Sequence, residues 1–164
     1  MRTLVVSGLL ATVMILGSGT PSDAATFLGL GFLDGSPESF ATAISADGST
    51  VVGKTSSFEG GKAFRWDATD GMQDLGNLSG GVVFAAAYGV SSDGTTIVGS
   101  SQSTFGAEAF RWDATNGMQG IGDIPGGPFS SISRGVSADG SIVLGEGLSD
   151  SRRQAFLWDA INGI

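Results

Sequence analysis

The side chains of this sequence that could do chemistry are mainly carboxylates, because its 164 residues include neither histidine nor cysteine. A histidine base, a thiolate nucleophile, a Ser-His-Asp triad and a Cys or His zinc site are therefore excluded. Carboxylates could still bind calcium through their oxygens, or cleave glycosidic bonds as an acid and base pair. Asp67 and Asp70 flank one short loop and are the candidates for a calcium site.

These two aspartates belong to a motif that returns at a spacing of 46 residues. Residues 63–67 read Ala-Phe-Arg-Trp-Asp, 109–113 repeat this sequence unchanged, and 155–159 repeat it with leucine in place of arginine. Between 62–81 and 108–127, 13 of 20 positions are identical without a gap. Repetition at this period indicates an architecture of like units more strongly than it indicates a reaction.

Each repeat has the pattern of two β-hairpins. Its first half places an Asp-Gly pair between runs rich in valine, isoleucine and threonine, which predicts a tight turn with positive φ angles. In the second half, Phe64 and Trp66 share one face of a strand while Arg65 points to the other. A glycine-containing loop then turns the chain into a return strand. The Asp-Gly turn residues are Asp47, Gly48, Asp93, Gly94, Asp139 and Gly140.

The recurring aromatic and aspartate residues are interpreted as scaffold. One Phe and Trp pair per unit fits a layer that packs neighbouring sheets together, and an exposed platform for stacking on sugars is the alternative. An aspartate that opens a loop accepts backbone N–H groups one or two residues further on. Asn116 and Asn162 replace the second calcium candidate in the later copies. The structural set is Phe64, Trp66, Asp67, Phe110, Trp112, Asp113, Phe156, Trp158 and Asp159.

These patterns predict an all-β chain of tandem four-stranded antiparallel repeats, 46 residues each, which form part of a β-propeller-like array. A β-solenoid is the alternative architecture. The 28 glycines are interpreted as turn positions, because the composition is otherwise able to form a core. The predicted divisions are a signal peptide (1–24) and a β-repeat array (25–164), with a partial unit (26–38), two units (about 39–84 and 85–130) and an incomplete unit (131–164).

The unit resembles the HAF repeat of bacterial extracellular repeat proteins. Three segments match that family's signature in order, namely Ala63–Asp67, Leu75–Gly81 and Val90–Gly94. The chain departs from the signature at its first letter, where Lys62, Glu108 and Gln154 replace the histidine. The resemblance implies a secreted or surface-exposed protein with a propeller-like fold and no established activity.

The first 24 residues have the pattern of a secretory signal peptide. Arg2 precedes an apolar run from Leu4 to Leu16, and small residues stand before the expected cleavage site after Ala24. The apolar run is shorter than the roughly 20 residues that cross a bilayer, so no membrane span is expected in the mature chain. We therefore expect a secreted or cell-surface protein.

The composition excludes some partners without naming one. A net charge of −8 argues against nucleic acid, and no cofactor is predicted. A protein or a glycan at the cell surface is the kind of partner considered. Any active site should break the repeat symmetry, which directs attention to Glu38, Glu59 and Glu146 and to the adjacent pair Arg152 and Arg153.

The sequence is compatible with two functions. The first is an exported, non-enzymatic scaffold or binding module, and the alternative is the blade portion of a secreted carboxylate-dependent glycan hydrolase or lyase. The last repeat stops at Ile164, where its return strand should begin, and about three units are too few to close a propeller of typically 4 to 8 blades. We therefore expect a fragment of a longer chain.

Overall fold

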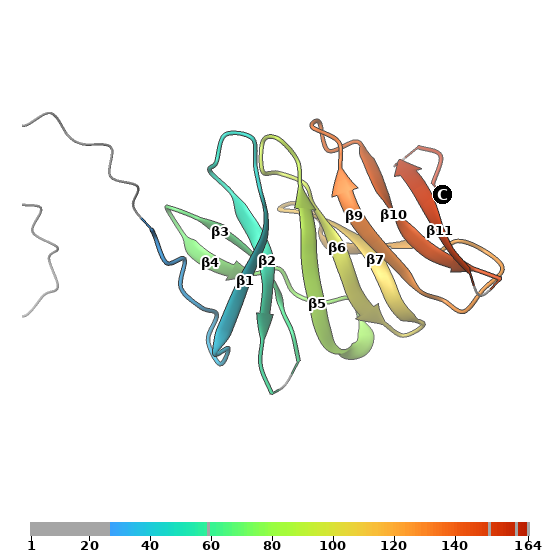
Figure 1. The fold of residues 1–164 in the computed structure, drawn as a ribbon, viewed down its shortest axis with the longest axis horizontal. Helices are drawn as coiled ribbons and strands as arrows, with labels where there is room; N and C mark the ends of the chain where they lie inside the picture. Colours follow the sequence, from blue (N-terminus) through green and yellow to red (C-terminus); the bar gives the residue numbers. More distant parts are fainter. Residues whose placement is uncertain (1–26, 59, 151, 160, 164) are drawn as a thin grey trace, which may run out of the picture.

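The computed structural model describes residues 27–58, 60–150, 152–159 and 161–163. These residues form eleven strands in three antiparallel sheets, and none of them is helical, as the sequence predicts (Figure 1). None therefore lies in a helix long and apolar enough to cross a membrane. The predicted signal peptide, 1–24, lies outside the described residues.

Each sheet is a meander in which every strand pairs with the next strand of the chain. The first sheet contains β1 (Glu38–Ile44), β2 (Val51–Ser56), β3 (Ala63–Asp67) and β4 (Gly71–Asp74). The second contains β5 (Gly80–Val90), β6 (Ile97–Ser103), β7 (Gly106–Asp113) and β8 (Gly117–Gly122). The third contains β9 (Ser131–Val136), β10 (Ile142–Ser149) and β11 (Arg152–Asp159).

The third sheet has a single bridge where the other sheets have a fourth strand. Asp159 and Gly163 form this isolated antiparallel bridge, just after β11. Consecutive antiparallel strands are the arrangement of a propeller blade, whereas a solenoid pairs strands from successive coils. The sheets therefore favour the propeller-like architecture over the solenoid.

A glycine beneath a phenylalanine ring recurs in all three sheets. Gly99 of β6 pairs with Phe110 of β7, and a β-carbon on Gly99 would lie 2.8 Å from the Phe110 ring. The equivalent distances are 2.7 Å at Gly53 and 2.5 Å at Gly145. Because only glycine leaves this space, the ring can pack directly against the neighbouring strand and be buried.

The Asp-Gly turns are wider than the sequence predicts. Gly48 has a φ of 74°, but no described aspartate of these turns has a positive φ, which a two-residue primed turn would require. Ser45 and Thr50 instead close a four-residue loop, through a bond of 2.9 Å from the Ser45 N–H to the Thr50 carbonyl. The Ser45 hydroxyl also donates to Asp47 at 2.6 Å, so side-chain hydrogen bonds hold the wider loop.

The three sheets stand side by side, with their turns linked at one end (Figure 1). The Ala46 N–H donates to the Ser92 carbonyl at 3.1 Å, and the Ser92 N–H donates to the Ala138 carbonyl at 3.0 Å. These three positions are 46 residues apart, so the repeat period is also the spacing between neighbouring sheets. The turn glycine of each later sheet packs on a threonine of the sheet before it: Gly94 on Thr50 and Gly140 on Thr96.

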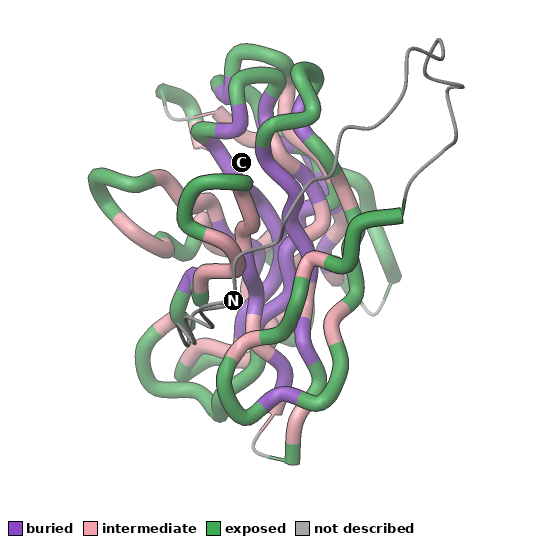
Figure 2. The backbone as a smooth tube through the Cα atoms, turned by 90° about the vertical axis from the view of Figure 1, so that its left-hand side faces the viewer, coloured by how far each residue is buried: buried purple, intermediate pink, exposed green. Residues whose placement is uncertain are grey.

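The core lies between the sheets. Val52 of the first sheet packs with Ile97 and Phe110 of the second, and all three are fully buried. Leu75, in the connection between the two sheets, belongs to the same cluster. Figure 2 shows the buried residues gathered along the middle of the strands and the exposed residues mainly in the turns. The second sheet, which lies between the other two, therefore buries residues on both of its faces.

Candidate functional site

Two equivalent clefts open between neighbouring sheets. The first cleft, between the first and second sheets, has a volume of about 580 Å³, and the second cleft, between the second and third sheets, about 550 Å³. Their linings are related by the 46-residue repeat, and the corresponding pairs are Arg65 and Arg111, Gly94 and Gly140, Trp112 and Trp158, Asp113 and Asp159, and Asn116 and Asn162.

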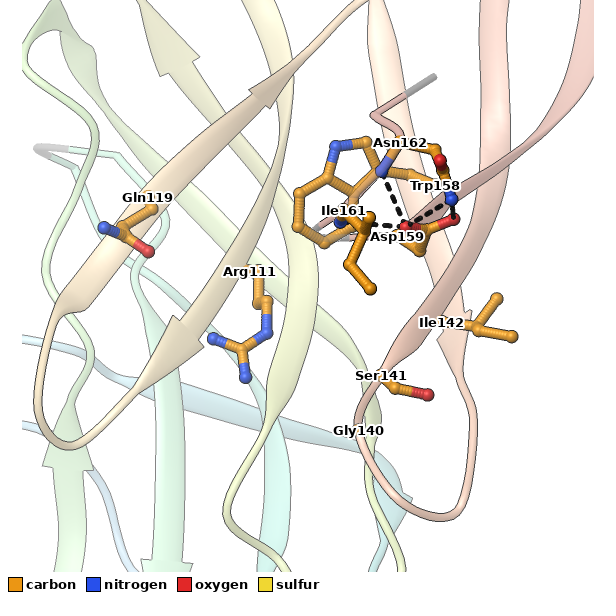
Figure 3. A pocket seen from close by; sticks show the side chains of 9 residues that line it. All are labelled: Arg111, Gln119, Gly140, Ser141, Ile142, Trp158, Asp159, Ile161 and Asn162. Carbon is orange, nitrogen blue, oxygen red and sulfur yellow. Dashed lines mark hydrogen bonds between the residues drawn. The ribbon is translucent and has the colours of Figure 1, made fainter.

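Each cleft takes its arginine from one sheet and its aromatic ring from the next. In the second cleft, Arg111 and Gln119 project from β7 and β8 on one side (Figure 3). Trp158, Asp159 and Asn162 come from the end of β11 and its loop on the other side. The cleft thus offers an indole, a guanidinium and two side-chain amides, which suits a polar ligand with a flat or apolar face.

The arginines are already oriented by bonds within their own sheets. Arg65 donates to Asp67 at 2.8 Å and to the amide oxygen of Gln73 at 2.7 Å. Arg111 bonds the Asp113 carboxylate at 2.5 Å and the Thr96 hydroxyl at 3.2 Å. A guanidinium has five N–H donors, so each arginine keeps further donors for a ligand.

The aspartates that end β3, β7 and β11 hold the loops that follow them. The Thr69 and Asp70 N–H groups donate to Oδ1 of Asp67 at 2.9 and 2.8 Å. These bonds lower the pKa of Asp67. The bond from the Asp70 N–H has the largest effect, and the charge of Arg65 has a smaller one. The equivalent loops of the second and third sheets repeat both backbone bonds, to Asp113 and Asp159.

An asparagine strengthens this loop in the second and third sheets. The Asn116 amide donates to both carboxylate oxygens of Asp113, at 3.0 and 3.1 Å. This side-chain bond is the largest cause that lowers the pKa of Asp113 to about 2. Asn162 makes the same two bonds to Asp159, at 3.1 and 2.9 Å, and lowers its pKa.

The aspartates of the Asp-Gly turns are also held as ionised acceptors. The hydroxyl of Ser45 is the largest cause that lowers the pKa of Asp47 to about 2. Ser137 does the same for Asp139, whose pKa is also about 2, and Ser91 lowers the pKa of Asp93. General acid catalysis near neutral pH needs a carboxyl group with a raised pKa. Every clearly shifted carboxyl pKa in the described part of the chain is lowered instead.

The phenylalanines and the tryptophans of the repeated aromatic pairs differ in burial. Phe64, Phe110 and Phe156 are buried, with 1%, 0% and 7% of their surface exposed. The tryptophans at 66, 112 and 158 are only half-buried, and the latter two line the clefts. The phenylalanines therefore occupy the expected inter-sheet core, whereas each tryptophan lies at its edge with part of the ring accessible.

In the loop of Asp67 and Asp70, the carboxylate oxygens of Asp67 accept hydrogen bonds from protein groups. Both oxygens of Asp67 face donors, one the backbone N–H groups and the other Arg65. No cluster of three or more Asp, Glu, His or Cys side chains suited to a metal occurs among the described residues. A calcium ion there would have to displace these bonds, so the geometry adds no support to the calcium hypothesis.

Glu38 and Glu146, two of the carboxylates that break the repeat symmetry, lie in different sheets. Glu146 accepts from Arg134 at 2.7 Å and from Arg153 at 3.2 Å, and Arg134 is the largest cause that lowers its pKa. Glu38 begins β1 in the first sheet, and Glu59 lies outside the described residues. Glu146 is thus paired with arginines, and not with a second carboxylate as glycoside cleavage needs.

Sequence reasoning missed the arginines and the threonines of the clefts. Arg65 and Arg111 recur within the repeated motif, and Leu157 breaks the series. Thr50 and Thr96 recur in the same way before the second strand of each sheet. The sequence alone assigns these residues no role, and only the stacking of the sheets shows that they lie at a cleft between two units.

The fold and the clefts define a class of protein, namely an all-β chain of stacked antiparallel sheets with repeated clefts between them. No protein-family profile matches the sequence, so membership of the HAF repeat family is not confirmed. No curated protein matches the sequence either.

The sheets are similar to those of TolB, a β-propeller protein. TolB from Acinetobacter baumannii superposes with a TM-score of 0.58 at 18% identity, over 82% of this chain and 33% of TolB. A protein assigned as TolB from Agrobacterium tumefaciens gives 0.53 at 18% identity, over 77% of this chain and 43% of the other. The chain thus spans less than half the length of either structure. Likeness at this identity shows the fold alone, and a partial propeller fits it.

Proposed function

We propose that this chain is an exported, non-enzymatic β-repeat protein that acts at the cell surface or outside the cell as a scaffold or binding module. The observation that carries the proposal is the recurrence of one cleft at both sheet junctions, with the same arginine, tryptophan, aspartate and asparagine. A catalytic centre is normally a single constellation, whereas a repeated site suits a ligand that is itself repetitive, such as a glycan or an extended protein surface.

The electrostatics of the clefts support binding over catalysis. Asp113 and Asp159 have lowered pKa values, and their carboxylate oxygens accept hydrogen bonds from loop N–H groups and from an asparagine amide. Such carboxylates are poor proton donors and are already saturated as acceptors. The groups left for a ligand are the face of Trp158, the remaining donors of Arg111 and the exposed amide of Gln119.

Export is proposed from the sequence of 1–24 and from the resemblance to HAF repeat proteins. Mass spectrometry of the protein recovered outside the cytoplasm should give a chain that begins at Ala25. A chain that stays in the cytoplasm with Met1 intact would contradict this part of the proposal.

The binding proposal is tested with two arginine variants and a panel of surface glycans. Arg65 lines only the first cleft, whereas the Arg111 side chain shares the face of Thr96 and Val98 that turns toward the third sheet and the second cleft. Arg65→Gln should therefore weaken the first class of sites and Arg111→Gln the second, when binding is measured by calorimetric titration. Both ion pairs are partly exposed, so each variant should stay folded, which circular dichroism checks.

The same glycans should be recovered uncut after incubation with the protein. Cleavage products that appear with the wild-type chain would favour the hydrolase or lyase alternative. Equal binding by the wild-type chain and by Arg111→Gln would contradict the assignment of the clefts as the binding sites.

A further inference from the structure

The outward face of the third sheet is more apolar than the same face of the other two sheets. Three repeat positions on this face carry threonine, valine and arginine in the first two sheets, namely Thr50, Val52 and Arg65, and Thr96, Val98 and Arg111. The third sheet carries Ile142, Leu144 and Leu157 there. Leu144 and Leu157 are register partners on β10 and β11, and Ile142 is two residues along β10, so all three share one face. We call it the trailing face.

The trailing face is uncovered, whereas its counterparts are buried. Val52 and Val98 are 0% exposed because the next sheet packs over them, but Leu144 is 50% exposed. Thr50 and Thr96 are 4% and 3% exposed, but Ile142 is 45% exposed. Leu157 is 67% exposed, and no described segment covers it. Three large apolar side chains on one face therefore meet solvent where the repeat normally places another sheet.

The other end of the stack carries the complementary face. Ile44, Val51 and Trp66 are successive register partners across β1, β2 and β3 and share the face that points away from the second sheet. We call it the leading face. Ile44 is 60% exposed, whereas its counterpart Val90 packs into the core between the first two sheets.

The segment before β1 already supplies part of a sheet junction. Residues 30–35 match the connection at 75–80, and in that connection Leu75 and Leu78 pack into the core between the first two sheets. The corresponding Leu30 and Leu33 are half-buried beside the first sheet. The leading face thus has the connection that a preceding sheet would provide, and no sheet of the described residues packs on it.

We propose that the trailing face of one copy of this chain docks on the leading face of a second copy, head to tail. The contact repeats the junction that the chain makes twice within itself, between the first and second and the second and third sheets. Both faces of this junction lie on the described part of every copy, so a second copy can supply the partner that each face lacks. Replacement of Thr, Val and Arg by Ile, Leu and Leu strengthens the apolar part of the face, the opposite of what a face in contact with water requires.

A head-to-tail contact is heterologous, so it either closes into a ring or continues as a filament. Two copies would contribute six sheets, a number within the usual range of closed propellers. The proposal concerns assembly and does not rest on ligand binding in the clefts.

The experiment measures molar mass by light scattering during size-exclusion chromatography over a wide range of protein concentration. The wild-type chain should elute as a dimer or a larger assembly. Leu144→Asp and Ile44→Asp should each shift it to monomer, because each buries a carboxylate in one half of the junction. Both side chains are at least half exposed within one copy, so the variants should keep the wild-type circular dichroism. Val82→Asp is the matched control, since Val82 is 74% exposed on the middle sheet.

Mixing the two variants tests the head-to-tail geometry directly. Leu144→Asp keeps an intact leading face and Ile44→Asp keeps an intact trailing face, so an equimolar mixture should form a complex with one copy of each. A wild-type chain that is monomeric at every concentration would overturn the proposal and leave a different protein or a further sheet as the occupant. Assembly that persists in Ile44→Asp would also overturn it, because it would show that two trailing faces pair with each other. Loss of assembly in Val82→Asp would exclude both end faces as the cause.

Discussion

The glycine beneath the phenylalanine ring should be the least replaceable small residue of each sheet. Gly99 of β6 lies between the backbone of β5 and the ring of Phe110, and a β-carbon there would overlap the carbonyl oxygen of Ala86. It would also lie 2.8 Å from Cε1 of Phe110, closer than side-chain carbons pack. Gly99→Ala must therefore push β5 away from β6 or drive the ring out of the core.

The expected loss is about 3 kcal/mol of unfolding free energy, the upper end of the usual range for overpacking. We expect a loss at the upper end because the added β-carbon meets the β5 backbone on one side and the fully buried Phe110 ring on the other, and neither can move away easily. Urea unfolding followed by tryptophan fluorescence measures the loss as a shift of the midpoint at constant slope.

Gly135→Ala is the matched control. A β-carbon on Gly135 would meet the Leu144 side chain at 3.5 Å, an ordinary contact, and Gly135 has no positive φ. Its effect should stay within about 1 kcal/mol. If Gly99→Ala also stays within that limit, or if both alanines cost the same, the close approach of β5, β6 and the Phe110 ring is wrong.

Three further predictions follow from burial and charge. Phe110→Ala should cost about 3–5 kcal/mol in urea unfolding, and Trp112→Ala should cost less, because Trp112 is only half-buried; the reverse order would contradict their placement. Ser133→Ala should raise stability by roughly 1 kcal/mol, since the buried Ser133 hydroxyl has no partner among the described residues and Ala87 fills the equivalent position; a clear loss of stability would show a missed hydrogen bond. The pKa values of Asp47, Asp113 and Asp139 fall from 3.8 to about 2 on folding, so the stability they contribute is present above pH 4 and is lost as the pH falls from about 4 to 2; an acid titration in urea should show that fall, reduced in Asp113→Asn.

The strands and their order could be predicted because local patterns determine them. Two-residue alternation of Phe64 and Trp66 identifies a strand whatever lies around it, and the loop glycines mark where the chain reverses. A repeat that satisfies these rules three times over leaves little freedom for another topology. The all-β class and the antiparallel sheets are therefore confirmed.

The turn width and the burial of the tryptophans could not be obtained in this way. Asp-Gly alone favours a two-residue turn, but Ser45 competes by hydrogen bonding to Asp47 and to the Thr50 N–H, and the loop widens. Phe64 and Trp66 share one face of a strand, yet only the position of the neighbouring sheet decides which of them lies at its centre.

The clefts were beyond sequence reasoning for the same reason. Arg65 and Trp112 are 47 residues apart and lie on different sheets, yet they line one cleft. Their proximity depends on the stacking distance and on the angle between sheets, which no local pattern encodes. A comparison of the repeats does contain one signal. Ile142 stands where the first two sheets have Thr50 and Thr96, and this replacement distinguishes the third sheet.

The central claim is that neighbouring sheets stack with a register of one repeat, and a disulfide test examines it most directly. The chain has no cysteine of its own, so a designed pair reacts without background. A β-carbon on Gly140 would lie 3.0 Å from that of Thr96, slightly shorter than the roughly 3.5–4.5 Å found in disulfides, so a small outward shift of the turn brings the pair into bonding range. Thr96→Cys with Gly140→Cys should therefore form an intramolecular disulfide on mild oxidation, seen as a loss of two free thiols without a covalent dimer on a denaturing, non-reducing gel. Thr50→Cys with Gly140→Cys, which joins the first and third sheets, should stay reduced. Equal oxidation of both pairs, or reaction of the second pair alone, would contradict the stacked arrangement.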